Sequence, residues 1–85
     1  MPIEVRQLRF AVATADTMSF SRAATALNVK QSTLSKRIAT LEVQLGVKLF
    51  ERSTRGAIPL ESGKTFLEIA RRILTEIQSL QKSVE

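Results

Sequence analysis

The sequence of 85 residues contains no cysteine and no histidine. It can therefore form no disulfide bond and no thiolate zinc site. It also lacks the side chain that most often serves as a metal ligand or as a general base at neutral pH. Serine, lysine and glutamate are present, but no motif pairs them for catalysis, and no glycine-rich loop could cradle a phosphate group. We therefore predict a protein that is not an enzyme and that binds no metal and no cofactor.

Long apolar runs are absent as well. None exceeds a few residues, whereas a helix that crosses a membrane needs about 20. The first residues, MPIEVRQ, lack the basic and then apolar form of a signal peptide. Apolar residues nevertheless make up 44% of the chain, which is enough for one small domain with a modest core. We expect a cytoplasmic protein with no membrane partner.

Acidic residues are scarce in the middle of the chain, where the formal net charge of +5 is concentrated. Between residues 22 and 64 the acidic residues are Glu42, Glu51 and Glu61. The basic residues in the same range are Arg22, Lys30, Lys36, Arg37, Lys48, Arg52, Arg55 and Lys64. A local positive charge of this kind suits a polyanion, either a nucleic acid or a membrane surface. A solvated basic face with no partner would give the same composition.

The spacing of apolar residues predicts three helices in the first half of the chain. The first covers residues 4–15. The second, FSRAATAL, starts after Ser19, whose hydroxyl can accept from a free backbone N–H group, and is followed by Asn28, which tolerates a left-handed turn. The third ends at Gly46 and has on one face Leu34, Ile38, Leu41 and Leu45. The connection before the third helix is short, so the last two helices must cross steeply, as in a helix-turn-helix.

The segment VKLFERSTRGAIPL, after the third helix, predicts two short strands joined by a basic loop. Pro59 cannot donate a hydrogen bond within a sheet, so the second strand is expected to be very short or at an edge. The loop RSTRG could be a solvated hairpin tip. It could also be a wing in which Arg55 enters a minor groove and Arg52 lies nearer the phosphates.

A long helix is predicted from Ser62 to about Val84. Its main apolar stripe follows a heptad spacing and consists of Phe66, Ala70, Ile73, Ile77, Leu80 and Val84. Further apolar residues widen this face beyond what a chain of this size can cover. We therefore expect one part of the face to pack on the chain's own helices and the rest to form a homodimer interface. Ile3 and Phe10, on a second apolar face of the first helix, are expected to assist.

The N-terminal end of the third helix is the candidate site. Its exposed face carries side chains that can hydrogen-bond base edges, namely Gln31, Ser32, Thr33, Ser35 and Lys36. No acid occurs in this helix before Glu42, although acids are usually favoured in a first helical turn. An acid-free turn with free N–H groups suits a ligand that carries phosphates. The alternatives are a three-helix bundle without this function and a winged-helix protein-interaction module that binds no DNA.

The run from Met18 to Gly63 resembles the DNA-binding domain of LysR-type transcriptional regulators, through the segments SFSRAA, LNV, QSTLSKRIATLE, LGVKLFER and the later glycine. The resemblance covers the long helix as well. It implies a mainly α fold, with a winged helix-turn-helix of three helices and a two-stranded wing in residues 1–61 and a dimerisation helix in residues 62–85. It also implies that a dimer binds an imperfectly palindromic site in double-stranded promoter DNA.

Further site residues follow from the resemblance. In that family, the positions matching the base-reading residues above face the major groove, and those matching Ser21 and Arg37 approach phosphates. We expect the same of the basic Arg22 and Lys30. Lys30 departs from the family, which usually has Ser or Thr there, so the third helix should lack a side-chain cap.

The resemblance also concerns what lies beyond this chain. Family members carry a larger C-terminal domain that senses a small molecule. We expect this chain to be cut short or to have lost that domain, so that an effector site and any tetramer would depend on the missing part. When bound to DNA, the protein would lie in a bacterial nucleoid.

RNA is a weaker alternative partner. The deep, narrow major groove of double-stranded RNA excludes a helix of this kind. Single-stranded RNA is usually bound by exposed aromatic side chains, and the four aromatics here are all Phe and are expected to be mostly buried.

Overall fold

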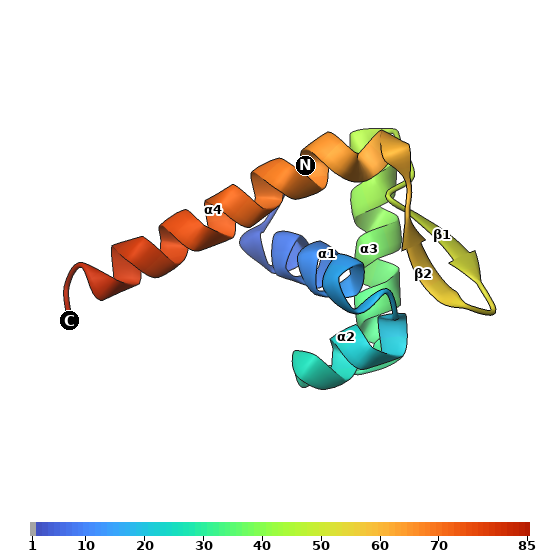
Figure 1. The fold of residues 1–85 in the computed structure, drawn as a ribbon, viewed down its shortest axis with the longest axis horizontal. Helices are drawn as coiled ribbons and strands as arrows, with labels where there is room; N and C mark the ends of the chain where they lie inside the picture. Colours follow the sequence, from blue (N-terminus) through green and yellow to red (C-terminus); the bar gives the residue numbers. More distant parts are fainter. Residues whose placement is uncertain (1) are drawn as a thin grey trace.

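The computed structural model describes residues 2–85 and confirms the predicted winged helix-turn-helix. The elements, in order, are α1 (Val5–Thr17), α2 (Phe20–Ala26), α3 (Gln31–Leu45), β1 (Phe50–Ser53), β2 (Gly56–Pro59), the 3-10 turn η1 (Glu61–Gly63) and α4 (Lys64–Lys82). Helices α1, α2 and α3 pack together, the hairpin lies at one edge, and α4 crosses α1 and projects beyond it (Figure 1). The molecule is accordingly elongated, measuring 43 × 26 × 22 Å.

The core lies between the first three helices and is closed by the hairpin. Leu34, Ile38 and Leu41 form the predicted inner face of α3 and are fully buried. They meet the small side chains of α2, Ala23 and Ala24, which let the two helices approach closely. Because these residues hold the inner face of α3, the opposite face of that helix is turned outward.

The turns between the first three helices follow the predicted chemistry. The Ser19 hydroxyl accepts from the backbone N–H of Arg22 at 3.1 Å and caps α2. Asn28 adopts the left-handed conformation, with φ of 57°. Val29 follows it, donates its backbone N–H to the carbonyl of Ala24 at 3.0 Å, and packs against the core. The helix-turn-helix therefore has the steep, tightly closed turn that the sequence indicates.

The ends of α3 also agree with the sequence. Lys30 is the N-cap residue and offers no side-chain hydrogen bond to the first turn. At the other end Gly46 is left-handed, with φ of 74°, and its N–H donates to the carbonyl of Glu42 at 2.9 Å. The first N–H groups of α3 thus have no side-chain cap, whereas near its C-terminal end the carbonyls of Glu42 and Val43 accept from the Gly46 N–H.

The hairpin is short and is tied to the loop between α1 and α2. Its antiparallel register runs from Phe50 opposite Pro59 to Ser53 opposite Gly56, so Pro59 stands at the end of the ladder, as expected. The Ala57 N–H donates to the carbonyl of Met18 at 3.1 Å. Gly56 has φ of 115°, and a Cβ there would collide with the same carbonyl oxygen. A side chain at position 56 would therefore displace the wing.

The long helix begins two residues later than predicted. Ser62 lies in the 3-10 turn η1, where its hydroxyl donates to the carbonyl of Lys48 at 2.6 Å. Gly63 packs so closely on Leu49 that a Cβ would lie 2.7 Å from the Leu49 side chain. This close packing holds the start of the helix beside the base of the hairpin and replaces the regular first turn that we expected.

Helix α4 packs on α1 through its first half only. Leu67 and Ala70 are buried there, and the Arg71 guanidinium donates to the Asp16 carboxylate at 2.6 Å. The expectation that Phe10 would assist a dimer interface is wrong, because Phe10 is 4% exposed within its own core. Ile3, in contrast, is 45% exposed. Among residues 2–85, no helix is long and apolar enough to cross a membrane.

Candidate nucleic-acid interface

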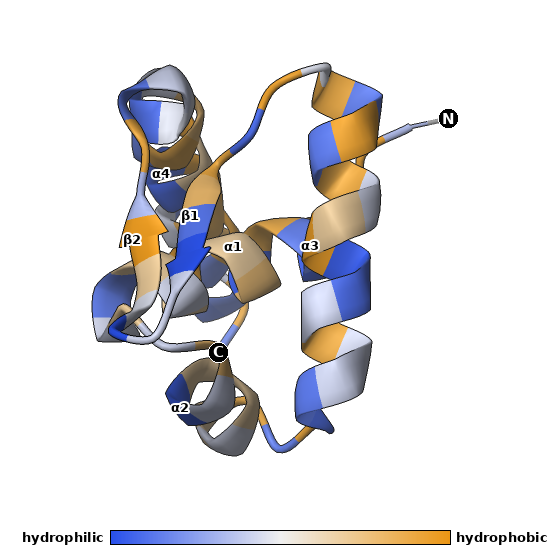
Figure 2. Ribbon diagram, turned by 90° about the vertical axis from the view of Figure 1, so that its right-hand side faces the viewer, coloured by the Kyte–Doolittle hydropathy of each residue, from blue (hydrophilic) through white to orange (hydrophobic). Residues whose placement is uncertain are grey.

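The outward face of α3 presents polar side chains along its N-terminal half. Hydrophilic colours dominate that half in Figure 2, and hydrophobic ones are more frequent toward its C-terminal end. Gln31, Ser32 and Lys36 are exposed, and Thr33 and Ser35 are partly buried. All five predicted base-reading residues therefore lie in the first two turns of one helix, at a surface that another molecule can reach.

The electrostatic character of this face is uniformly positive. The first turn of α3 contains no acid, and the first acidic residue of the helix, Glu42, is buried on the inner side. Lys36 and Arg37, together with Thr33 and Thr40, line a shallow polar depression on the helix surface. The positive end of the helix dipole adds to these charges. This arrangement can attract an anion and offer it several hydrogen-bond donors.

The predicted phosphate residues outside α3 lie at the starts of helices. Ser21 and Arg22 are exposed in the first turn of α2, and Lys30 is exposed immediately before α3. The uncapped N–H groups beside Lys30 are available to a phosphate oxygen. Cationic or hydroxyl side chains thus accompany two helix N-termini.

The two arginines of the hairpin have different surroundings. Arg55 is exposed at the tip, and in residues 2–85 its guanidinium has no bonded partner, although its backbone N–H donates to the Ser53 hydroxyl at 3.1 Å. Arg52 instead turns back onto α3, where its Nη1 donates to the Ser35 Oγ at 2.6 Å. Its guanidinium also lies 4.3 Å from the centre of the Phe20 ring. The interpretation of the loop as a wing assigns both arginines to a nucleic acid, but of the two only Arg55 has a guanidinium without a bonded partner among residues 2–85.

Two features of the site were not predicted. One is the link from Arg52 to Ser35. The other is Glu42, whose buried carboxylate accepts from the backbone N–H groups of Leu49 at 2.7 Å and Phe50 at 3.3 Å. The sequence could have indicated the link from Arg52 to Ser35, because Arg52 follows the buried Phe50 by two residues and therefore lies on the same face of the strand. The role of Glu42 could have been suspected because this acidic residue directly follows Leu41 on the inner side of a helix.

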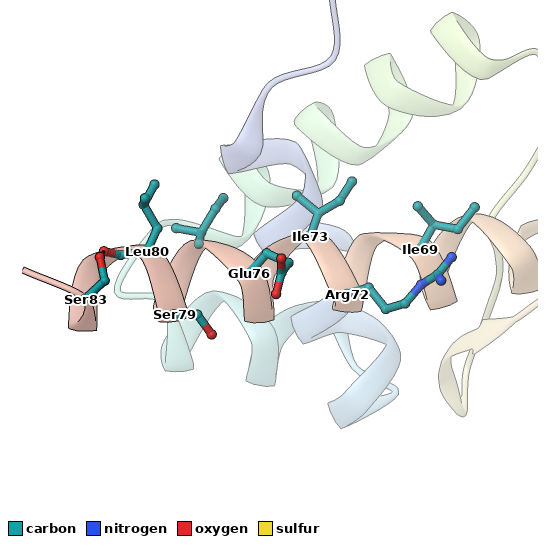
Figure 3. Close-up of a pocket in the computed structure, with 8 residues that line it drawn as sticks. Ile69, Arg72, Ile73, Glu76, Ser79, Leu80 and Ser83 are labelled. Atoms are coloured by element: carbon teal, nitrogen blue, oxygen red, sulfur yellow. Dashed lines mark hydrogen bonds between the residues drawn. The ribbon is translucent and has the colours of Figure 1, made fainter.

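A second candidate surface lies on the distal half of α4. Ile69, Ile73 and Leu80 project to the same side of the helix (Figure 3) and are 43%, 41% and 69% exposed. They belong to an open groove lined by Ile69, Arg72, Ile73, Glu76, Ile77, Ser79, Leu80 and Ser83. An uncovered apolar stripe of this kind on a helix that projects from its domain is typical of an interaction surface.

The predicted dimer stripe is therefore divided between two environments. Ala70 is 1% exposed and Phe66 is partly buried against the core, so both pack mainly on their own chain, and placing Ala70 in a dimer interface is wrong. Ile73, Leu80 and Val84 are exposed, and Ile77 is partly buried. The uncovered stripe is rotated relative to the predicted one and includes Ile69, which is not part of the predicted stripe.

Comparison with known proteins places this architecture in a wider context. Residues 5–64 match the family model described as "Bacterial regulatory helix-turn-helix protein, lysR family". Over 85 residues the chain is 40% identical to the uncharacterized HTH-type transcriptional regulator YnfL of Escherichia coli (strain K12). The aligned region covers all of this chain but only 29% of the length of that regulator.

Solved structures agree with this match over nearly the whole chain. The crystal structure of the CbnR_DBD–DNA complex has a TM-score of 0.87 and 40% sequence identity, and covers 95% of this chain and 94% of that one. The crystal structure of the BenM_DBD/catB site 1 DNA complex has a TM-score of 0.91 and 33% identity, with coverages of 96% and 92%. Both structures are complexes of those domains with DNA.

Proposed function

The chain belongs to the LysR family of bacterial regulatory helix-turn-helix proteins, and from this premise we propose that it binds double-stranded DNA sequence-specifically as a homodimer. It would do so as the DNA-binding part of a transcriptional regulator. In this role the protein is not an enzyme, and it works in the bacterial cytoplasm on an imperfectly palindromic promoter site. The similar CbnR and BenM domains have been crystallised with DNA, which supports the proposal.

The observation that carries the proposal is the acid-free, polar N-terminal half of α3, which faces outward beside a basic hairpin. A helix in the major groove reads base edges through side chains in its first turns. The proposed readers are Gln31, Ser32, Thr33, Ser35 and Lys36. Glutamine and lysine can bond adenine and guanine, and the small hydroxyls can bond either kind of base.

Contacts to the DNA backbone would position the readers. We assign this role to the residues at the helix N-termini and beside the reading face, Ser21, Arg22, Lys30 and Arg37. Arg55, free at the hairpin tip, would enter the neighbouring minor groove. The arginines and lysines release counterions when they meet phosphates, so the affinity falls as salt rises.

Dimerisation would set the distance between two reading helices. The uncovered stripe of α4 is the proposed interface, and a two-fold pairing places the same residues of both chains against each other. Two copies of α3 would then lie about one helical turn of DNA apart, or a multiple of it. This spacing accounts for a site with two similar halves.

The proposal can be tested by selection from a random pool of double-stranded DNA at two salt concentrations, followed by sequencing of the bound fraction. We expect an enriched motif with two-fold symmetry and an affinity that falls steeply with salt. Salt-sensitive binding without an enriched motif would contradict base reading. If no salt-sensitive binding occurred at all, the protein-interaction module would be the better description.

A further inference from the structure

The hairpin contacts α3 at Ser35, which is one of the five proposed base-reading residues. Arg52 Nη1 donates to the Ser35 Oγ at 2.6 Å, and Nη2 lies 3.4 Å from the Ser35 carbonyl oxygen. The same guanidinium covers the Phe20 ring at 4.3 Å, and Phe20 in turn meets the edge of Phe50 at a centroid distance of 6.0 Å. Arg52 is therefore held by α2 and α3 at once.

The backbone of the hairpin directs Arg52 toward this position. Arg52 and Phe50 lie on one face of β1, and their cross-strand partners are Ala57 and Pro59. Phe50 and Ala57 are buried in the core, so this face of the strand is turned toward the helices. The side chain of Arg52 reaches Ser35 because the fold points it there.

The bond between the Arg52 guanidinium and the Ser35 hydroxyl determines which further hydrogen bonds the hydroxyl can make. A serine hydroxyl has one hydrogen to donate and two lone pairs that accept, whereas a guanidinium only donates. The bond from Arg52 occupies one of the two lone pairs of Ser35 and leaves its hydrogen and the second lone pair free. The hydroxyls of Thr14, Thr17 and Thr25 donate to the carbonyl four residues earlier, but in residues 2–85 the Ser35 hydroxyl donates to no such partner.

We infer that Arg52 is a positioning residue, which favours donation by the Ser35 hydroxyl to an acceptor on a base edge in the major groove. This inference rests on the proposed function. The acceptors available there are N7 and O6 of guanine, N7 of adenine and O4 of thymine, whereas cytosine presents an amino donor. A neighbouring cation also strengthens the hydroxyl as a donor. A cytosine amino group would have to donate to the remaining lone pair of Ser35 beside the positive guanidinium, which is unfavourable. Ser35 thereby discriminates against cytosine at the position that it reads.

The experiment measures affinity for the selected DNA with each of the four bases at the position whose preference Ser35→Ala alters. For Arg52→Met we expect discrimination against cytosine there to fall roughly tenfold, as for the loss of one base contact. Discrimination at other positions should persist. In the Ser35→Ala background the same change should have little further effect on discrimination, because the group that Arg52 orients is gone.

The salt dependence separates positioning from a phosphate contact. Arg22→Met removes an exposed guanidinium that we assign to a phosphate contact, and it should reduce the steepness of the slope of log affinity against log salt by about 0.9, the value for one phosphate. Arg52→Met should lower it by much less, because its guanidinium is already engaged by Ser35. If Arg52→Met instead lowered the slope by about 0.9 and weakened all sequences equally, Arg52 would be a phosphate contact and the inference would be overturned.

A second variant guards against a folding defect in Arg52→Met. Arg52→Lys keeps a cation for the Phe20 ring but cannot reproduce the two-nitrogen contact with Ser35. It should show the same loss of discrimination, with thermal unfolding used to confirm that the variant is folded. Retained discrimination in both variants would overturn the inference while leaving the proposed function intact. Absence of an enriched motif for the unaltered protein would overturn both.

Discussion

Two glycines with positive φ show how differently single residues constrain this chain. Gly46 ends α3 with φ of 74°, and a Cβ there would meet nothing within 4 Å. Gly56 has φ of 115°, and a Cβ there would collide with the Met18 carbonyl. Position 46 therefore requires only a left-handed backbone conformation. Position 56 requires a positive φ and also the absence of a side chain beside the Met18 carbonyl.

Substituting alanine at each position should separate these effects. Gly46→Ala should lower the free energy of unfolding by about 1 kcal/mol, the cost of a left-handed alanine. Gly56→Ala should lower it by more than about 2 kcal/mol, because the collision adds to the strain. Urea unfolding of the two variants checks the difference. Equal losses would mean that the hairpin can move away from Met18 without cost.

Lys36 is the residue for which base reading can be tested most directly. It is exposed on the reading face of α3, and its loss in Lys36→Ala should weaken binding to the selected DNA by ~1–3 kcal/mol. Lys82→Ala removes the same charge at the far end of α4 and should have little effect. Fluorescence anisotropy with selected and scrambled DNA measures both. An unchanged affinity for Lys36→Ala would contradict its place among the readers.

Local side-chain chemistry could be predicted where it depends on neighbours in sequence. The cap by Ser19, the left-handed Asn28, the uncapped Lys30 and the stop at Gly46 all involve partners within a few residues. The partner of Arg52 is 17 positions away in sequence. The sequence could predict that an arginine in a basic loop binds phosphate. The direction in which the Arg52 side chain points depends on how the strand packs, which the sequence does not show.

At the scale of elements, Glu42 joins the end of α3 to the start of β1. Its carboxylate accepts from the backbone N–H groups of Leu49 and Phe50, which are buried with it. Outside the β ladder, no other backbone acceptor in residues 2–85 bonds these two donors. A single side chain therefore satisfies the backbone at the point where the wing begins.

Removing that carboxylate should loosen the wing. Glu42→Ala should lower the free energy of unfolding by roughly 2–4 kcal/mol, because it leaves buried donors without a partner. Glu42→Gln retains one neutral acceptor and should cost less. Urea unfolding gives the stability, and hydrogen exchange at the Leu49 and Phe50 amides gives the local effect. Unchanged exchange in Glu42→Ala would show that water replaces the carboxylate without loss.

The elements themselves could be predicted because their patterns are strong, but their packing faces could not be assigned fully. The apolar stripe of α3 maps directly onto its buried face. On α4 the stripe is wider, and only the position of α1 decides which side is covered. This is why Ala70, a member of the predicted stripe, is buried in the chain while Ile69, which lies outside that stripe, is exposed.

At the scale of the whole molecule, dimerisation can be tested by substitutions in the uncovered stripe of α4. Leu80→Arg places a charge within the proposed interface and should weaken the dimer by more than about 2 kcal/mol, since a buried unpaired charge is costly. Gln78→Arg adds the same charge outside the residues that line the groove and should leave the dimer intact.

Sedimentation equilibrium measures this difference. We expect the Leu80→Arg protein to be mainly monomeric at concentrations where the Gln78→Arg protein is dimeric. Its affinity for DNA with two half-sites should fall toward that for a single half-site. Equal dimerisation of the two variants would move the interface elsewhere on the molecule.

The whole-molecule arrangement was only partly accessible from sequence. A partner surface could be predicted because the chain has more apolar helix face than it can bury. The orientation of α4, fixed by Leu67, Ala70 and the ion pair between Arg71 and Asp16, depends on contacts across the fold. No spacing of residues within α4 could have indicated them.

The contrast between the two halves of α4 has a mechanical consequence for the proposed dimer. The half packed on α1 moves as one body with the recognition helix, whereas the projecting half acts as a lever arm. From Ala70 to Lys82 this arm measures about 18 Å at 1.5 Å per residue. A change of about 10° in the angle at which the two arms cross would displace one domain relative to the other by about 3 Å, close to the roughly 3.4 Å spacing of base pairs. Small rotations at the crossing would thus be converted into steps of one base pair in the half-site spacing.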